Sequence, residues 1–214
     1  MSPHFVLDFD STLFDTSALW NAWRNMLEEL GYEEEQIREI ADRLIPEGFT
    51  PREHALRLGV NGKTLETALA SLNAFTQQTA PHLLYSDVVP FIQAHAPSTI
   101  LTFGDSGYQL EKIHASGLHA HVDDIRMANS FRGKALQLGE MFQADAVTPL
   151  VFVDDSLGEL EAVHASALPI TLVRMKRPGQ RRSLETHPLD HEAWRVIESL
   201  EELSFQPTVS RYES

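Results

Sequence analysis

Two aspartates one residue apart, Asp8 and Asp10, are the residues with the clearest capacity for chemistry. They follow directly on the apolar run His4–Leu7, which has the pattern of a short buried strand. Because side chains alternate along an extended chain, both carboxylates are expected to point to the same side. Two acids this close repel each other unless a cation lies between them or their roles differ. In isolation the pattern is typical of a strand that ends in an acidic turn.

Two later positions carry groups that suit a phosphate. Thr102 lies at the end of a second expected strand, so its hydroxyl and the backbone N–H groups of the following turn could hold a phosphate oxygen. A threonine in such a turn also serves as a helix cap. Lys134 opens an expected helix, where the helix dipole disfavours a cation. That position indicates either a specific task or an ordinary surface lysine.

A cluster of acids follows the apolar run Leu150–Val153. Asp154 and Asp155 are adjacent, and Glu159 comes four residues after Asp155. In a turn that enters a helix, Asp155 and Glu159 can approach the same point. Hard oxygen ligands of this kind suit Mg2+. The segment therefore favours a magnesium site.

Strand-like and helical segments alternate through most of the chain. Besides the first strand, strands are expected at 99–103, from 121, at 150–153 and at 169–173, and helices at 87–95, 108–116, 134–142, 157–165 and 191–203. Such alternation is typical of an α/β fold, a parallel sheet covered by helices on both faces. The ligand site of such a sheet lies at the carboxyl ends of its strands.

A long segment after the first strand has helical spacing only. Its apolar residues, for example Trp20, Trp23 and Leu27, recur at the spacing of one helix face, and no run in it resembles a strand. We therefore expect residues 16–80 to form an all-helical insertion. Residues 1–15 and 81–203 would form the α/β core, and residues 204–214 a poorly ordered polar tail.

Composition narrows the function. The chain has 214 residues, 43% of them hydrophobic, and no cysteine, which excludes a disulfide framework, a thiolate nucleophile and a zinc–cysteine site. A net charge of -14 argues against non-specific binding to nucleic acid or to an anionic membrane. No apolar run approaches the ~20 residues that span a bilayer, and no signal segment precedes the first strand. The cytoplasm is the expected compartment, and no partner protein is evident.

The order of these groups along the chain, D-x-D, then Thr, then Lys, then Asp-Asp, resembles that of the haloacid dehalogenase superfamily. F-V-L-D-F-D-S-T-L is similar to its first motif, I-L-T-F to its second, R-G-K-A-L to its third and V-F-V-D-D-S-L-G-E to its fourth. The likeness covers His4 to about Val173. It implies a Rossmannoid parallel-sheet core with an inserted helical cap of the C1 type.

The resemblance implies a catalytic role for each matched residue. Asp8 would be the nucleophile that forms an aspartyl-phosphate, and Asp10 the general acid and then the general base. Thr102 and Lys134 would hold the transferring phosphoryl group. Ser11 stands where glycine is frequent in the first motif and must tolerate the turn.

The resemblance also implies a set of Mg2+ ligands. They would be Asp8, the backbone carbonyl of Asp10, and Asp155. Asp154 or Glu159 would contact these ligands without binding the ion directly. Asp154 replaces a common glycine and Glu159 a common aspartate, so the ligand geometry at the fourth motif is expected to be shifted.

The function that this pattern favours is a Mg2+-dependent phosphatase acting on a small phosphorylated metabolite. A sugar-phosphate mutase of the same superfamily differs only in returning the phosphoryl group. A haloacid dehalogenase-type hydrolase is another alternative, and Asp10 counts against it because a halide needs no proton and those enzymes resemble D-x-Y. A non-enzymatic phosphoacceptor module is a third, and the helical insertion counts against it because such a module needs no substrate lid.

Two weaker signals remain. His119 and His121, with Asp123, could form a transition-metal site, although an ordinary surface strand end is the simpler interpretation. The basic run from Arg174 to Arg182 follows the last expected strand, so it begins at the ligand-binding edge and could grip a phosphorylated substrate. A solvated loop is its simpler interpretation.

Overall fold

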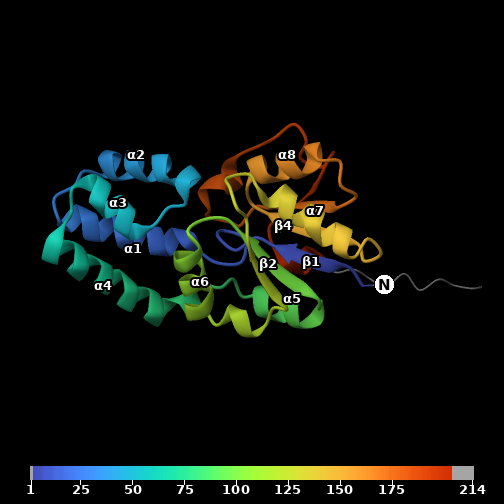
Figure 1. Cartoon of the computed structure of the whole chain (residues 1–214), viewed down its shortest axis with the longest axis horizontal. Coiled ribbons are helices and arrows are strands. Elements are labelled where there is room, and N and C mark those ends of the chain that lie inside the picture. The colour runs from blue at the N-terminus through green and yellow to red at the C-terminus, as the bar shows by residue number, and fades with distance from the viewer. Residues whose placement is uncertain (1, 204–214) are drawn as a thin grey trace, which may run out of the picture.

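The computed structural model describes residues 2–203, so the expected tail at 204–214 lies outside the described residues. At its centre is a six-stranded parallel sheet with the strand order β3-β2-β1-β4-β5-β6 (Figure 1). The strands are β1 (His4–Leu7), β2 (Ser98–Thr102), β3 (Asp124–Met127), β4 (Leu150–Asp154), β5 (Thr171–Met175) and β6 (Arg195–Ile197). The parallel α/β sheet expected from the sequence is therefore present, with β1 between β2 and β4.

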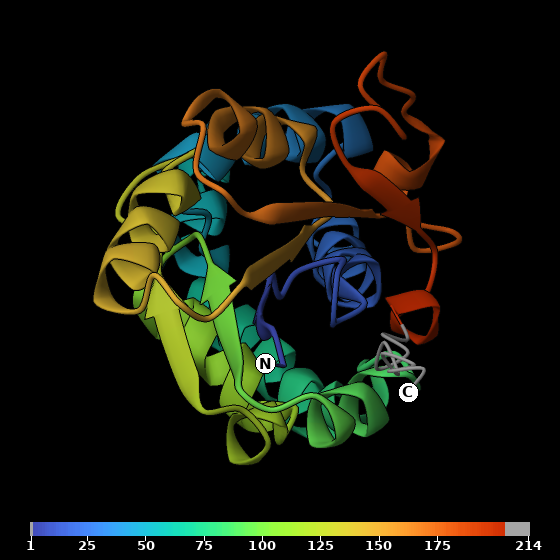
Figure 2. The same ribbon diagram turned by 90° about the vertical axis from the view of Figure 1, so that its right-hand side faces the viewer.

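Helices cover both faces of the sheet (Figure 2). They are α5 (Val88–Ala94), α6 (Ser106–Ala115), α7 (Lys134–Ala144) and α8 (Leu157–Ala165). Val6 and Phe152 point to the face that packs on α7 and α8, whereas Phe5 and Leu7 point to the face that packs on α5 and α6. Because both faces are buried, the central strands consist of continuous apolar residues, the pattern by which they were predicted.

Between β1 and α5 the named elements are all helical, and α1 to α4 gather at one end of the molecule (Figure 1). This helical block, residues 16–79, contains α1 (Thr16–Glu29), α2 (Glu34–Leu44), α3 (Pro51–Leu58) and α4 (Gly62–Thr79). The block has a hydrophobic cluster of its own. At its centre His54 accepts a hydrogen bond from Trp23 Nε1 (3.0 Å) and donates through Nε2 to the carbonyl of Ile37 (2.9 Å). The chain leaves α1 and α3 through Gly31 and Gly59, at φ of +92° and +94°, a conformation that glycine adopts without strain.

Element boundaries differ modestly from those expected. The third strand begins at Asp124 rather than near residue 121, and β5 extends to Met175. Within residues 2–203 the structure also has 3-10 turns, four of them between longer elements and one, Leu200–Leu203, after β6: Ile45–Glu47, Ala80–His82, Leu118–Ala120, Arg181–Leu184 and Leu200–Leu203. None of the described helices combines the length and the apolar character needed to cross a bilayer.

The helix expected at 191–203 is wrong. Its apolar residues recur every three positions from Trp194 to Leu203, a spacing that favours a helix. Instead, Arg195–Ile197 form the edge strand β6, which pairs with β5, and a 3-10 turn follows at the end. Asp190 accepts a hydrogen bond from Trp194 Nε1 (2.8 Å), which tightens the turn before the strand. The edge of β5 provides backbone hydrogen-bond partners for Arg195–Ile197, and such a tertiary contact is not encoded in the local spacing of apolar residues.

Candidate active site

Three buried carboxylates meet at the carboxyl ends of β1 and β4. Asp8 directly follows β1, and its backbone N–H donates to the carbonyl of Val153 in β4 (2.9 Å). Asp154 is the last residue of β4, and Asp155 follows it. One oxygen from each of Asp8, Asp154 and Asp155 lies within 4.8 Å of the others. The adjacency of β1 and β4 therefore brings together acids that are almost 150 positions apart in the sequence.

Lys134 reaches this acid cluster from the first residue of α7. Its Nζ donates to Asp8 Oδ1 (2.5 Å) and to Asp154 Oδ2 (2.7 Å), and its side chain is 3% exposed. Glu159 Oε2 accepts from the backbone N–H of Lys134 (3.3 Å), so an acid lies at the start of α7. That acid offsets the unfavourable position of a cation at a helix N-terminus. The lysine singled out by its unusual place in the sequence thus contacts the proposed nucleophile.

The charges in the cluster shift its acid–base equilibria. Burial raises the pKa of Asp8 to about 7, despite the attraction of Lys134. Burial likewise raises the pKa of Asp154 to about 6 and that of Asp155 to about 6, although Arg182 Nη1 lies 3.1 Å from an oxygen of Asp155. Burial opposes the ammonium form of Lys134, but the neighbouring carboxylates raise its pKa above the usual value. The cluster concentrates negative charge in a place where water does not screen it.

The donor set of this cluster fits a hard divalent cation. Carboxylate oxygens are the ligands that Mg2+ prefers. Both oxygens of Asp154 already accept hydrogen bonds, one from Lys134 and one from the backbone N–H of Ser156 (2.7 Å). Both oxygens of Asp155 accept from Arg182 Nη1 (3.2 and 3.1 Å), whereas Asp8 accepts from Lys134 through Oδ1. An ion at this cluster would therefore compete with Arg182 for Asp155, while Asp154 holds the lysine.

Asp10 occupies different surroundings. Its Oδ1 accepts from Lys112 Nζ (2.5 Å) and from Thr16 Oγ1 (2.7 Å), and its Oδ2 accepts from Gln109 Nε2 (2.8 Å). Although burial opposes the charged form, Lys112 and the other two donors lower the pKa of Asp10 below its usual value. The two aspartates of the D-x-D motif share none of these side-chain donors.

Thr102 lies where the second motif places it. It is the last residue of β2, it is 1% exposed, and its carbonyl accepts from the backbone N–H of Ala128 (2.8 Å). Because β2 and β1 are parallel neighbours, Thr102 is on the same edge of the sheet as Asp8. Its role toward a phosphate stays a prediction, as does that of the Asp10 carbonyl toward a metal.

Lys112 and Gln109, which bind Asp10, were not predicted from the sequence. Both lie on α6, where Gln109, Lys112 and Ile113 form the buried face. A lysine at an apolar position of an amphipathic helix was a usable signal, since buried lysines need an anionic partner. That signal could not have named Asp10 as the partner.

The basic run from Arg174 to Arg182 begins within β5 and is only partly buried, so its interpretation as a solvated loop holds only in part. Arg174 is 0% exposed, and Arg177 is 4% exposed and donates to Asp87 Oδ2 (2.7 Å). Arg182 reaches Asp155 at the carboxyl edge of the sheet. The run therefore contributes one cation to the acid cluster, while other members hold the loop to the core.

Among the described residues, His119, His121 and Asp123 do not come together as a metal site. His119 is exposed, and its ring lies 4.3 Å from that of His114. Within residues 2–203, the group of three or more side chains placed to share an ion is the cluster of Asp8, Asp154 and Asp155. The simpler interpretation, a surface position, agrees with this arrangement.

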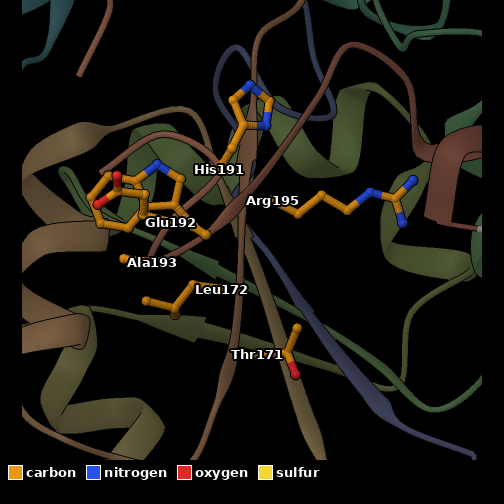
Figure 3. Close-up of a pocket in the computed structure, with 7 residues that line it drawn as sticks. Thr171, Leu172, His191, Glu192, Ala193 and Arg195 are labelled. Carbon is orange, nitrogen blue, oxygen red and sulfur yellow. The ribbon is translucent and has the colours of Figure 1, made fainter. Parts of the chain in front are cut away.

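A separate shallow pocket of about 340 Å³ lies at the amino ends of β5 and β6 (Figure 3). It is lined by Thr171 and Leu172 from β5 and by the segment from His191 to Arg195. Because the strands are parallel, this end of the sheet is opposite the acid cluster. The pocket contains none of the site residues expected from the sequence.

No protein-family model matches the sequence, and no curated protein matches it significantly. Comparison of folds does give matches. A protein named as a haloacid dehalogenase-like hydrolase from Burkholderia xenovorans has a TM-score of 0.73 and 21% identity, covering 96% of this chain and 99% of that one. The HAD-hydrolase YfnB from Bacillus subtilis, described as bound to magnesium, has a TM-score of 0.63 and 18% identity, covering 94% and 96%.

Other similar structures are described by names that refer to different activities. CbbY from Rhodobacter sphaeroides, in complex with phosphate, has a TM-score of 0.61 and 17% identity, covering 95% of this chain and 97% of that one. A protein from Thermotoga maritima that is described as a β-phosphoglucomutase without an established activity, and a protein described as a dehalogenase, are also among the matches. At these identities the likeness establishes the fold and leaves the activity open. The chain has the fold of the haloacid dehalogenase superfamily of hydrolases.

Proposed function

We propose that this protein is a Mg2+-dependent phosphatase that hydrolyses a small phosphomonoester through an aspartyl-phosphate on Asp8. The observation that carries the proposal is the position of the Asp8 carboxylate, held by Lys134 inside a buried acid cluster at the carboxyl edge of the sheet. A carboxylate is a poor nucleophile toward a phosphate dianion unless positive charge offsets the repulsion. This arrangement supplies that charge.

The first chemical step uses Asp8 and Asp10 together. An oxygen of Asp8 attacks phosphorus, a new bond forms between them, and the bond from phosphorus to the ester oxygen breaks. Asp10, having taken up a proton, delivers it to the leaving oxygen, so that an alcohol departs. Lys134 and Thr102 orient the phosphoryl group and offset its charge, which is most of what phosphoryl transfer requires.

The second step restores the nucleophile. Asp10 takes a proton from water, whose oxygen attacks phosphorus while the bond to Asp8 breaks. Inorganic phosphate is released and both aspartates are regenerated. Asp10 thus serves first as acid and then as base, which is why one carboxylate suffices for both half-reactions.

The acid cluster is where we expect Mg2+ to bind. Asp8, Asp155 and the backbone carbonyl of Asp10 would hold the ion. Asp154 and Glu159 would lie next to these ligands without binding the ion directly. When bound, the ion supplies positive charge that polarises the phosphoryl oxygens and reduces their repulsion of Asp8. The magnesium bound to YfnB, a similar fold, supports this choice of metal.

The helical block is proposed as a cap that covers this site. Thr16, the first residue of α1, donates to Asp10, and Phe49 lies with its ring 6.4 Å from that of Tyr108 in the core. Gly48 packs so closely on the core that an added Cβ would lie 3.2 Å from the backbone nitrogen of Asp105. A cover of this kind excludes water other than the attacking molecule.

Gln180 joins both connections between the block and the core. Its Oε1 accepts from Ser17 Oγ (2.6 Å), and its Nε2 donates to Asp15 Oδ1 (2.8 Å) and to the Tyr85 hydroxyl (2.8 Å). Asp15 precedes the block, and Tyr85 follows it. This amide is therefore placed where movement of a cap would pivot, which supports the proposed lid.

Among the alternatives, a sugar-phosphate mutase remains the nearest, since the fold also occurs in a protein described as a β-phosphoglucomutase. A dehalogenase has no use for the ordered carboxylate of Asp10, because a halide leaves without a proton. A phosphoacceptor module has no use for the helical block.

A panel of alkyl and sugar monophosphates, assayed with Mg2+ and with a chelator, tests the proposal. We expect free phosphate from at least one substrate class, loss of that activity in the chelator, and no activity in a folded Asp8→Asn variant. A product that keeps its phosphoryl group would indicate the mutase. Phosphate release undiminished in Asp8→Asn would contradict the proposed mechanism.

A further inference from the structure

Lys112 is a buried cation outside all of the motifs that suggested the proposed function. It lies on α6 and is 2% exposed, and its ammonium forms an ion pair with Asp10 (2.5 Å). Its Nζ also lies 5.0 Å from the centre of the Tyr108 ring and 5.5 Å from that of Phe9. Aromatic faces attract a cation and restrict the long side chain that carries it. Lys112 is thus a fixed donor rather than a mobile surface charge.

Gln109, one helical turn earlier, reaches the other oxygen of Asp10. Its Nε2 donates both to Asp10 Oδ2 (2.8 Å) and to the carbonyl of Phe103 (2.9 Å). The backbone makes room for this amide at Gly104, where φ is +145° and an added Cβ would lie 2.7 Å from Gln109 Nε2. A side chain at residue 104 would displace the amide from Asp10. The loop after β2 is therefore shaped around this contact.

Counting acceptor positions shows what the network leaves open. A carboxylate has about four lone-pair positions, two on each oxygen. Lys112 and Thr16 fill the two on Asp10 Oδ1, and Gln109 fills one on Oδ2. One acceptor position remains, and it is on Oδ2. Any water or leaving-group oxygen that exchanges a proton with Asp10 in this arrangement must use that position.

We propose that Lys112 and Gln109 are positioning residues that fix the Asp10 carboxylate, so that Oδ2 alone takes the proton from the attacking water. The inference rests on the proposed function and extends it to two residues on α6. In the step concerned, water gives a proton to Asp10 Oδ2, its oxygen bonds to phosphorus, and the bond from phosphorus to Asp8 breaks. Lys112 and Gln109 act on this step through their hydrogen bonds to the Asp10 carboxylate.

The test separates the two half-reactions with an activated aryl phosphate, whose leaving group hardly needs a proton. Lys112→Met and Gln109→Leu each remove one donor to Asp10. Lys63→Met, at an exposed residue of α4, is the matched control. Rapid-quench kinetics measures release of the aryl alcohol, hydrolysis of the phosphoenzyme and the amount of phosphoenzyme at steady state.

We expect aryl alcohol release in the first turnover to be unchanged in both variants. Hydrolysis of the phosphoenzyme should slow by about 10- to 100-fold, part of the range that acid–base catalysis contributes. The phosphoenzyme should therefore accumulate, with little change in KM and no effect of Lys63→Met. In an Asp10→Asn background, Lys112→Met should cause no further loss, since residues that act as a unit are not additive.

Hydrolysis of the phosphoenzyme at the wild-type rate in both variants would overturn the role of Lys112 and Gln109. So would a loss from Lys112→Met that multiplies with that of Asp10→Asn. If Lys112→Met does not fold, Gln109→Leu decides the question alone. Failure of the proposed function has a different signature, because the wild type would then form no phosphoenzyme at all.

Discussion

Asp8 and Asp10 are one residue apart, yet their surroundings are opposite. Asp8 is buried among other acids around Lys134, and its pKa is raised to about 7. Asp10 receives three donors, and its pKa is lowered, with Lys112 the largest contributor to that lowering. The sequence motif supplies two identical carboxylates, and the packing of separate elements against them places one in a buried acid cluster and the other in a network of three donors. Residue type alone does not assign the role.

Replacing Asp10 should give the largest difference in rate between alkyl and aryl phosphates. It is therefore the most direct test of the different roles proposed for Asp8 and Asp10. Asp10→Asn removes the proton donor, so we expect the first step with alkyl phosphates to slow by ~100- to 10,000-fold. With p-nitrophenyl phosphate the first step should change little, while the second slows and the phosphoenzyme accumulates. Single-turnover kinetics with both substrates measures this. Equal losses in the first step would mean that Asp10 only maintains the site.

Metal binding should depend on the acid cluster that contains Asp8 and Asp155, and not on the surroundings of the Asp10 side chain. Saturating Mg2+ at about 100 times its dissociation constant stabilises a protein by about 2.7 kcal/mol. For a chain of this length that corresponds to a rise in Tm of about 5–10 °C. We expect Asp155→Asn to abolish the rise and Lys63→Met, on the helical block, to preserve it. A rise that persists in Asp155→Asn would remove this carboxylate from the metal site.

Replacing Asp8 and replacing Asp10 should also change the pH dependence of the protein's stability differently. This effect should be smaller than those on catalysis and metal binding. Where the folded pKa of an acid is raised, the folded state binds more protons, so stability falls as pH rises from the ordinary pKa to the raised one. In a chelator, Tm should therefore fall between about pH 4 and pH 7, and Asp8→Asn should flatten that fall. The lowered pKa of Asp10 acts only at more acidic pH, so Asp10→Asn should leave this slope unchanged. Thermal unfolding across this pH range is the measurement, and identical slopes in all three proteins would contradict the contrast.

Much of the fold followed from the sequence because the central strands are buried on both faces. Buried parallel strands are continuous apolar runs, and the helical block has a separate periodicity. The convergence of Asp8 and Asp155 also followed, since the carboxyl ends of parallel strands share one edge of the sheet. The place of Lys134 beside them was implied by the family resemblance.

What the sequence did not predict depends on tertiary partners. The apolar spacing around the edge strand β6 favours a helix, and its strand conformation depends on pairing with β5, which local spacing does not encode. Lys112 and Gln109 are separated from Asp10 by about 100 positions, and nothing local ties α6 to the D-x-D motif. Arg182 was noticed as part of a basic run, but its contact with Asp155 depends on the path of the loop after β5.

The most direct test of the central claim is identification of the phosphorylated residue. The wild-type protein would be mixed with Mg2+ and the activated aryl phosphate, quenched in acid during turnover, digested and analysed by mass spectrometry. The account predicts one phosphoryl group on the peptide that contains Asp8, its increase in Lys112→Met, and its absence in Asp8→Asn. Phosphate release without a phosphorylated peptide, or with the phosphoryl group on a residue other than Asp8, would contradict it.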